Sequence, residues 1–204
     1  MTNRDKTKES ALKLFNEMGY ANVRLQHISD DCLVSVGNMA YHFKNKQAIL
    51  KAVYEDLAQR HQSLLSDLNQ VPIFDYMDEH FQKVYRVVET YQFFYLDTND
   101  IIRSDEEIAL KYTQYLKWEK EQLIQVFRFN VSRGSFLPMS DDTLAHLSEL
   151  ISLIKQGWVN PVILKDPEAN QRFKTFIWDT LYPYFSERGV TEYEQMRKLH
   201  QTNW

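Results

Sequence analysis

Residues that break regular structure are scarce in this chain, which has only five glycines and five prolines in 204 residues. Both residue types mark turns, so a chain with so few of them is poorly suited to the many tight turns of a β-rich fold. Apolar side chains recur at helical spacing along most of the sequence, as in Ala11, Leu12, Phe15 and Met18. The sequence therefore predicts an all-α fold of long helices joined by short connections.

The composition excludes several classes of protein. A single cysteine, Cys32, rules out an intrachain disulfide framework and fits a reducing compartment. No apolar run approaches the roughly 18 residues of a membrane span, and the charged start of the chain lacks the apolar stretch of a secretory signal. We expect a cytoplasmic protein that has no membrane partner.

Charge is distributed unevenly along the chain. Residues 1–51 carry eight basic and five acidic side chains, a net charge of +3, whereas residues 52–204 carry 16 basic and 23 acidic ones, a net charge of −7. A basic segment on an acidic body is typical of a nucleic-acid-binding head. Random unevenness of surface charge would look the same, so charge alone does not decide between the two interpretations.

The most informative pattern lies in residues 8–50. A helix over residues 4–18 ends at Gly19, a second short helix follows, and Ser35 is a good N-cap for a third. Asn45 can cap a fourth helix. Three short helices in this order predict a helix-turn-helix.

The helix that follows Ser35 has two different faces. Met39 and Phe43 can pack on the rest of the head, which leaves the opposite face exposed. A helix enters the DNA major groove when its exposed face offers small and hydrogen-bonding groups. Lys46, at the start of the next helix, is expected to be free to meet a phosphate. The exposed face carries Val36, Gly37, Asn38, Tyr41 and His42.

Two runs of residues resemble the TetR family of bacterial transcriptional regulators. Residues 11–20, ALKLFNEMGY, are similar to the family's first helix and its cap, and residues 34–46, VSVGNMAYHFKNK, are similar to its recognition helix. The resemblance covers about the first 55 residues, and the remainder matches only in length and helicity. It implies an N-terminal DNA-binding domain, residues 1–47, and a helical ligand-binding and dimerisation domain, residues 48–204.

The resemblance also implies roles for individual positions. Val36, Gly37 and Asn38 would lie nearest the base edges, and Tyr41 and His42 would contact phosphate or a base. Lys46 would bind phosphate, and Arg24 and Gln26 would face the DNA backbone. The implied DNA-binding residues are Arg24, Gln26, Val36, Gly37, Asn38, Tyr41, His42 and Lys46. Two positions depart from the family pattern: Ala40 replaces a usual aromatic residue, and Leu33 stands where glycine is common, so a left-handed turn there would be strained.

The body of the chain is rich in aromatic side chains. These can fill a helical core, or they can line a cavity for an apolar ligand. The resemblance to ligand-responsive regulators favours a cavity, with candidate lining residues Phe81, Tyr85, Phe94, Tyr112, Tyr115 and Trp118. The effector itself is not indicated.

Two helices, at about residues 140–157 and 168–187, match the position where the family forms its dimer. An apolar face on each could meet a second copy, although both faces could instead pack inside one subunit. The faces are formed by Leu144, Leu147, Ile151, Ile154 and Trp158, and by Phe173, Phe176, Ile177 and Tyr184. Gly189 is expected to stop the second helix.

No constellation of catalytic residues stands out, and no cofactor is indicated. His146 with Glu149, and His80 beside two acidic residues, could each bind a metal with a third ligand, but a solvated helix face is the favoured interpretation. The sequence therefore predicts a non-enzymatic homodimeric repressor, released from a palindromic operator by a small molecule. One alternative is a ligand-binding or enzymatic helical protein that retains the head without using it. A second is a helical interaction module that acts as a scaffold.

Overall fold

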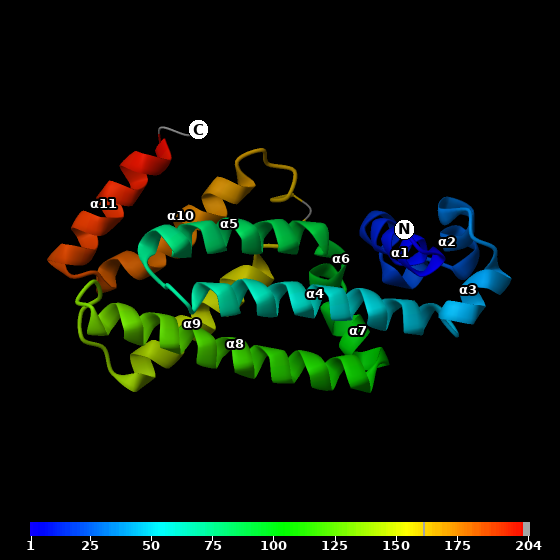
Figure 1. The fold of residues 1–204 in the computed structure, drawn as a ribbon, viewed down its shortest axis with the longest axis horizontal. Coiled ribbons are helices and arrows are strands. Elements are labelled where there is room, and N and C mark those ends of the chain that lie inside the picture. Colours follow the sequence, from blue (N-terminus) through cyan, green and yellow to red (C-terminus); the bar gives the residue numbers. More distant parts are fainter. Residues whose placement is uncertain (161, 202–204) are drawn as a thin grey trace. The chain divides into compact units, whose positions relative to one another are not determined.

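The computed structural model describes residues 1–160 and 162–201, and helices make up most of them (Figure 1). The all-α prediction is confirmed. No helix in these residues is long and apolar enough to cross a membrane. The α-helices are α1 (Asn3–Met18), α2 (Leu25–Cys32), α3 (Val36–His42), α4 (Lys46–Leu68), α5 (Phe74–Thr90), α6 (Gln92–Leu96), α7 (Thr98–Ser104), α8 (Glu106–Ser132), α9 (Asp141–Gly157), α10 (Ala169–Leu181) and α11 (Glu187–Gln201).

The chain divides into two compact units. The first contains residues 1–60 and 90–112, and the second contains residues 61–89 and 113–204. Helices α4 and α8 contribute residues to both units. The domain boundary predicted between residues 47 and 48 falls near the start of α4 and remains a prediction about function.

The first three helices form the expected helix-turn-helix around a small core. The core includes Phe15 of α1, Ile28 of α2 and Met39 of α3, all with almost no exposed surface. The Ser35 side chain accepts a hydrogen bond from the backbone N–H of Asn38, so the predicted N-cap of α3 is confirmed. A cap of this kind depends only on residues close to it in the sequence, which explains why the sequence predicts it well.

Positive-φ residues shape the turns of this head. Gly19 ends α1 with φ +76° and ψ 147°, a combination open almost only to glycine. Leu33 has φ +56° and ψ 33° between α2 and α3, so the left-handed turn forms even though its residue is a leucine. Such a backbone costs a leucine about 1–2 kcal/mol. The Leu33 side chain is 91% exposed and packs on little that could offset that cost.

Polar contacts join α1 to the segment around α6 within the first unit. The Asn16 amide donates to the carbonyl of Thr90 (2.8 Å) and accepts from the backbone N–H of Phe93 (3.1 Å). Asp97 accepts from the backbone N–H of Tyr20 at 2.8 Å. Each bond joins a side chain of one segment to the backbone of the other. Together they therefore fix the position of α1 against α6.

The second unit contains an aromatic core with a close backbone contact beside it. The rings of Phe74, Phe136, Trp178 and Phe185 lie 4.9–6.1 Å apart, centroid to centroid, in the contacting pairs.

The expectation that Gly189 stops a helix at residue 187 is wrong. Helix α10 ends at Leu181, before a 3-10 turn that contains Pro183, because proline has no N–H to continue the helical pattern.

Gly189 instead lies buried inside α11. A Cβ atom there would come within 2.0 Å of the backbone oxygen of Ser135. The glycine is therefore needed so that α11 can approach the segment that follows α8, and it does not act as a helix stop.

Candidate nucleic-acid interface and cavity

The exposed face of α3 is a hydrogen-bonding surface on a well-packed support. Met39 and Phe43 are buried, so the prediction of which face packs inward is confirmed. The side chains on the other face are exposed, and Tyr41 is 86% exposed. Apart from its chain neighbours and the backbone of its own helix, no atom lies within 4 Å of the position a Cβ would take at Gly37. The outward face consists of Val36, Gly37, Asn38, Ala40, Tyr41 and His42.

The side chain of Asn38 is held by the first residue of α1. Asn3 donates from its amide Nδ2 to Asn38 Oδ1 at 3.2 Å. Arg4 lies with its guanidinium 5.1 Å from the centre of the buried Phe43 ring. The N-terminus of α1 and the recognition-like helix α3 therefore share one surface of the first unit.

Arg24 and Gln26, at the start of α2, are both exposed. Gln26 donates from Nε2 to the Asp30 carboxylate at 2.7 Å. Both side chains are accessible to a DNA backbone, but Gln26 would first have to leave Asp30.

Lys46 is not free, and the sequence expectation is corrected on this point. Its ammonium donates to the backbone carbonyls of Tyr20 (2.9 Å) and Val23 (2.7 Å), and lies 4.3 Å from the centre of the Tyr20 ring. Burial lowers the pKa of the Lys46 ammonium. The side chain therefore closes the loop between α1 and α2, and the sequence could not show this because its partners lie more than 20 residues away.

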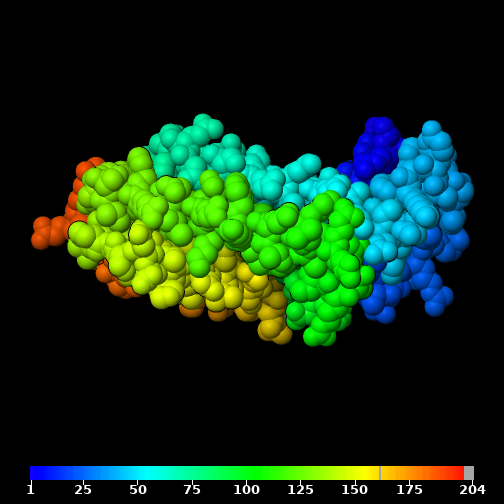
Figure 2. All heavy atoms as spheres, turned by 90° about the horizontal axis from the view of Figure 1, so that it is seen from below, coloured from blue at the N-terminus to red at the C-terminus, as the bar shows by residue number. Residues whose placement is uncertain are grey.

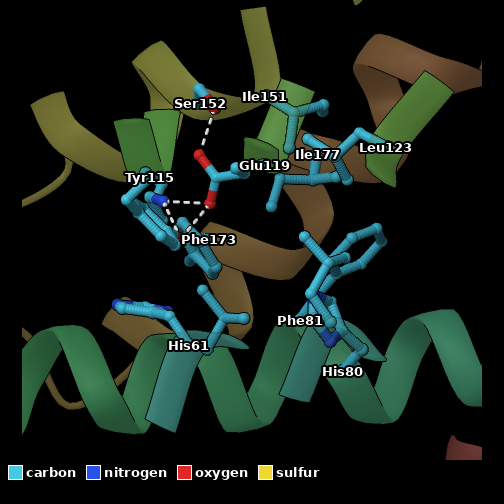
Figure 3. Close-up of a pocket in the computed structure, with 13 residues that line it drawn as sticks. His61, His80, Phe81, Tyr115, Glu119, Leu123, Ile151, Ser152, Phe173 and Ile177 are labelled. Carbon is cyan, nitrogen blue, oxygen red and sulfur yellow. Dashed lines mark hydrogen bonds and ion pairs between the residues drawn. The ribbon is translucent and has the colours of Figure 1, made fainter. Parts of the chain in front are cut away.

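The second unit encloses a small cavity between five helices (Figure 3). Its volume of about 30 Å³ has room for one or two water molecules. Most of the wall is apolar, but one side carries polar and charged groups. The lining residues are His61, Leu65, His80, Phe81, Val84, Tyr115, Glu119, Leu123, Ile151, Ser152, Lys155, Phe173 and Ile177.

A buried ion pair dominates the polar side of this cavity. Lys155 of α9 pairs with Glu119 of α8, and both side chains are less than 10% exposed. Glu119 also accepts hydrogen bonds from Ser152 and from the hydroxyl of Tyr115, and Lys155 donates to that hydroxyl at 3.1 Å (Figure 3). Burial raises the pKa of Glu119, but Lys155 and the two hydroxyls outweigh it and hold that pKa at about 2.

Two histidines line the same cavity, and the favoured interpretation of His80 as part of a solvated helix face is wrong because its side chain is buried. Burial lowers the pKa of His61 to about 3 and the pKa of His80 to about 4, so both imidazoles are neutral at pH 7. The Nδ1 atom of His80 lies 3.2 Å from the Leu64 carbonyl oxygen, which fits an N–H donor at that nitrogen.

The structure brings some of the predicted ligand residues to the cavity and not others. Phe81 and Tyr115 line it, Tyr85 packs on the lining residue Phe173, and the Trp118 ring lies beside Tyr115. The other two predicted residues belong to the first unit, where their rings pack 5.2 Å apart, and they do not reach this cavity; they are Phe94 and Tyr112.

The charged wall residues were missed by the sequence analysis. Glu119 stands between Tyr115 and Leu123 at a spacing of four residues, on the same helix face as two apolar side chains. Lys155 follows Ile151 in the same way. A charged residue on an otherwise apolar helix face is the sequence pattern that could have identified Glu119 and Lys155.

The apolar faces predicted for dimerisation are mostly inside the subunit. Leu144, Leu147, Ile151 and Ile154 of α9 are buried, as are Phe173 and Ile177 of α10. Spacings of three and four residues place the four α9 side chains on one side of the helix, which faces the core, and Ile151 among them lines the cavity. Tyr184 lies in the 3-10 turn after α10 and is partly exposed.

A different apolar surface is exposed on these two helices. It consists of Leu150 and Leu153 on α9 and Phe176 on α10, which are 43%, 57% and 53% exposed. Phe176 was among the predicted residues, and its ring lies 5.8 Å from that of Trp158.

The face of the second unit seen in Figure 2 has α8 and α9 side by side. Lys120 of α8 pairs with Glu149 of α9 at 3.2 Å, and His146 is exposed nearby on α9. No group of three potential metal ligands occurs in the described residues. The favoured interpretation of His146 and Glu149 as a solvated helix face is consistent with this placement.

Comparison with known proteins gives two family matches that together span most of the chain. The family described as "Bacterial regulatory proteins, tetR family" matches residues 9–53, and the one described as "Bacterial transcriptional repressor" matches residues 54–190. The comparison with curated proteins gave no match.

Solved structures share the fold at low sequence identity. A TetR-family transcriptional regulator from Marinobacter aquaeolei has a TM-score of 0.84 and 24% identity, over 97% of this chain and 98% of that one. PfmR from Thermus thermophilus has a TM-score of 0.73 and 19% identity, over 86% and 97%. The ketosteroid transcriptional regulator KstR2 of Mycobacterium tuberculosis has a TM-score of 0.73 and 16% identity, over 91% and 96%.

Proposed function

The chain belongs to the TetR family of bacterial transcriptional regulators, and we propose that it is a homodimeric repressor that a small molecule releases from its operator. The observation that carries the proposal is the exposed face of α3, where small and hydrogen-bonding residues stand on a buried apolar support. Such a protein acts on DNA in the cytoplasm, and no catalytic step is part of the proposal.

In this proposal, α3 enters the major groove. Val36, Gly37 and Asn38 meet base edges, because they lie at the leading end of the helix, while Tyr41 and His42 reach a phosphate or a base. The absence of a side chain at Gly37 leaves room for close approach of the DNA. Arg24, Gln26 and the backbone at the start of α4 contact phosphates.

The Lys46 side chain has a structural part in this proposal. Its hydrogen bonds to the carbonyls of Tyr20 and Val23 support the loop that precedes α2. A phosphate contact from its ammonium would require some of these bonds to break.

Two copies of the chain read a palindromic operator, with half-sites about 34 Å apart or a multiple of that distance. We place the dimer contact on α9 and α10, through Leu150, Leu153 and Phe176. Exposed leucines and an exposed phenylalanine on neighbouring helices are costly in water, and a second copy would cover them.

The effector acts through a population shift. One conformation holds the two α3 helices at the operator spacing, and a ligand in the second unit favours another. Helix α4 has residues in both units, which supports it as the connection. The alternative function, a ligand-binding protein or enzyme with an unused head, is not favoured, because the α3 face keeps exposed hydrogen-bonding side chains at Asn38, Tyr41 and His42.

The test is fluorescence anisotropy of the purified protein on its own upstream DNA and on scrambled DNA, across a salt series. We expect tight, salt-sensitive binding that prefers the upstream sequence. Asn38→Ala should reduce that preference by about 1–3 kcal/mol, because it removes a base contact.

Two exposed arginines of the first unit make a matched pair of variants. Arg24→Ala should weaken binding to both DNAs and lower the salt slope by about one, since a phosphate contact is lost. Arg103→Ala removes the same charge from α7 and should leave the slope unchanged. If both variants behave alike, or if selection from random duplexes yields no preferred sequence, the proposed DNA interface is wrong.

A further inference from the structure

The basic side chains of residues 1–51 are not equally available to a DNA phosphate. Three of the eight form ion pairs with carboxylates: Lys8, Lys13 and Lys51. A fourth, Lys46, is bound to backbone carbonyls. The other four are exposed and form no ion pair with any described residue: Arg4, Lys6, Arg24 and Lys44. These four side chains therefore carry the positive charge that a phosphate could meet.

Arg4 lies beside α3 and is supported there by an aromatic ring. Its guanidinium carbon is 5.1 Å from the centre of the Phe43 ring. Phe43 is the C-cap of α3 and is buried, whereas Arg4 is exposed. The neighbouring Asn3 donates to Asn38 Oδ1, near the start of α3. The first turn of α1 therefore contacts α3 near both of its ends.

A guanidinium that lies against a ring is well suited to a phosphate. The group is planar, and its N–H donors point outward from its edge. Contact of one face with a ring leaves that edge available for two parallel hydrogen bonds to phosphate oxygens. The ring also restricts the side chain before DNA arrives, which lowers the entropic cost of binding.

We propose that Arg4 binds a phosphate of the DNA backbone, so that the first turn of α1 is part of the DNA interface. This assignment rests on the proposed function, in which α3 lies in the major groove. Helix α3 has seven residues and is therefore about 10 Å long, close to the groove width of roughly 12 Å. A side chain beside Phe43, at the end of α3, is within reach of the phosphates that border the groove.

The role of this contact differs from that of the base-reading side chains. A phosphate contact carries no sequence information, so Arg4 sets the position and angle of α3 on the duplex while Asn38 meets a base. Arg4 supplies the contact that the position of Lys46 suggested, because the Lys46 ammonium is held by the carbonyls of Tyr20 and Val23. Loss of Arg4 should consequently weaken binding to every DNA sequence alike.

The test is a salt series of DNA anisotropy measurements on the full-length protein and its Arg4→Ala variant. The slope of log affinity against log salt should fall by about 0.9 for each bound subunit, because one phosphate contact is lost. Relative to 1 M salt, that change corresponds to an about eightfold loss of affinity per subunit at 0.1 M. Upstream and scrambled DNA should show the same change. An unchanged slope would overturn the assignment.

Lys6→Ala is the matched control for this variant. Lys6 is exposed, forms no ion pair with any described residue and lies on the same helix two residues later. Two residues turn an α-helix by about 200°, so Lys6 points away from the side that carries Arg4. Lys6→Ala removes the same charge and should leave the salt slope unchanged. Equal losses of slope in both variants would show that net charge explains the result, and the proposal would fail.

Two further variants separate the charge of Arg4 from its cover over the Phe43 ring. Arg4→Met keeps a long side chain over the ring without the charge, and its salt slope should fall as in Arg4→Ala. Arg4→Lys keeps the charge and should retain most of the slope. A retained slope in Arg4→Met, or a lost slope in Arg4→Lys, would show that Arg4 acts only through packing and would refute the phosphate contact.

Scrambled DNA distinguishes failure of this assignment from failure of the proposed function. If selection from random duplexes yields no preferred sequence, but Arg4→Ala alone lowers the slope on scrambled DNA, the phosphate contact stands and the operator-specific repressor is wrong. If the protein prefers its upstream DNA and Arg24→Ala lowers the slope while Arg4→Ala does not, the regulator stands and the assignment of Arg4 is wrong.

Discussion

Leu33 offers a direct test of how backbone strain affects the helix-turn-helix. Replacing it with glycine removes a left-handed backbone cost of about 1–2 kcal/mol for a leucine at φ +56°. The glycine in turn costs about 0.5–1 kcal/mol in backbone entropy. The side chain is 91% exposed, so little packing is lost. We therefore expect Leu33→Gly to raise the free energy of unfolding by about 0.5–1 kcal/mol.

The assay is urea unfolding followed by far-UV circular dichroism. All variants are compared at one protein concentration, because the stability of a dimer depends on it. With a slope of roughly 2–3 kcal/mol/M, the expected shift of the urea midpoint is about 0.3 M. Leu33→Asn should shift the midpoint in the same direction, since asparagine tolerates the left-handed region.

Leu110 supplies the matched control for this substitution. It is a 60% exposed leucine in α8 of the same unit, with helical backbone. Leu110→Gly should destabilise the protein by about 1 kcal/mol, which is the cost of glycine in a helix interior. The reasoning about strain is refuted if Leu33→Gly lowers the midpoint as Leu110→Gly does.

Two glycine substitutions and one change of pH provide further tests. Gly37→Ala should stabilise α3 by up to about 1 kcal/mol in urea unfolding and weaken operator binding by anisotropy; unchanged affinity would mean that the DNA does not approach closely there. Gly189→Ala should destabilise by about 1–3 kcal/mol, because its Cβ would collide with backbone; a neutral urea result would contradict that contact. Lowering the pH from 6.5 to 5 should cost about 2 kcal/mol for each of His61 and His80, because the unfolded state takes up protons that the folded imidazoles, with pKa values of about 3 and 4, do not. Unfolding of the His61→Gln/His80→Gln protein should depend less steeply on pH, and an unchanged slope would contradict the prediction.

The local features of the fold could be predicted from the sequence. Ser35 and Asn45 cap helices as expected, because a cap needs only its own side chain and a backbone N–H two or three residues along the chain. The helix that ends at Leu181 was predicted too long, because its apolar spacing continues past Pro183 while the backbone pattern does not.

The candidate DNA-binding surface was predicted for the same reason. Met39 and Phe43 define the buried side of α3 by spacing alone, and the exposed side follows from it. Lys46 marks the limit of this reasoning. Its charge and position suggested a phosphate contact, but its ammonium turns back to the carbonyls of Tyr20 and Val23.

What the sequence determined by itself is therefore the helical class, the caps and the two faces of each short helix, since these depend on interactions within a few residues. What only the tertiary structure decided is which distant side chains meet. Glu119 and Lys155 lie 36 residues apart and pair only because α8 packs on α9. Phe94 and Phe81 are both aromatic residues of the body, yet only Phe81 lines the cavity. Helix packing sets such partners, and no local pattern encodes them.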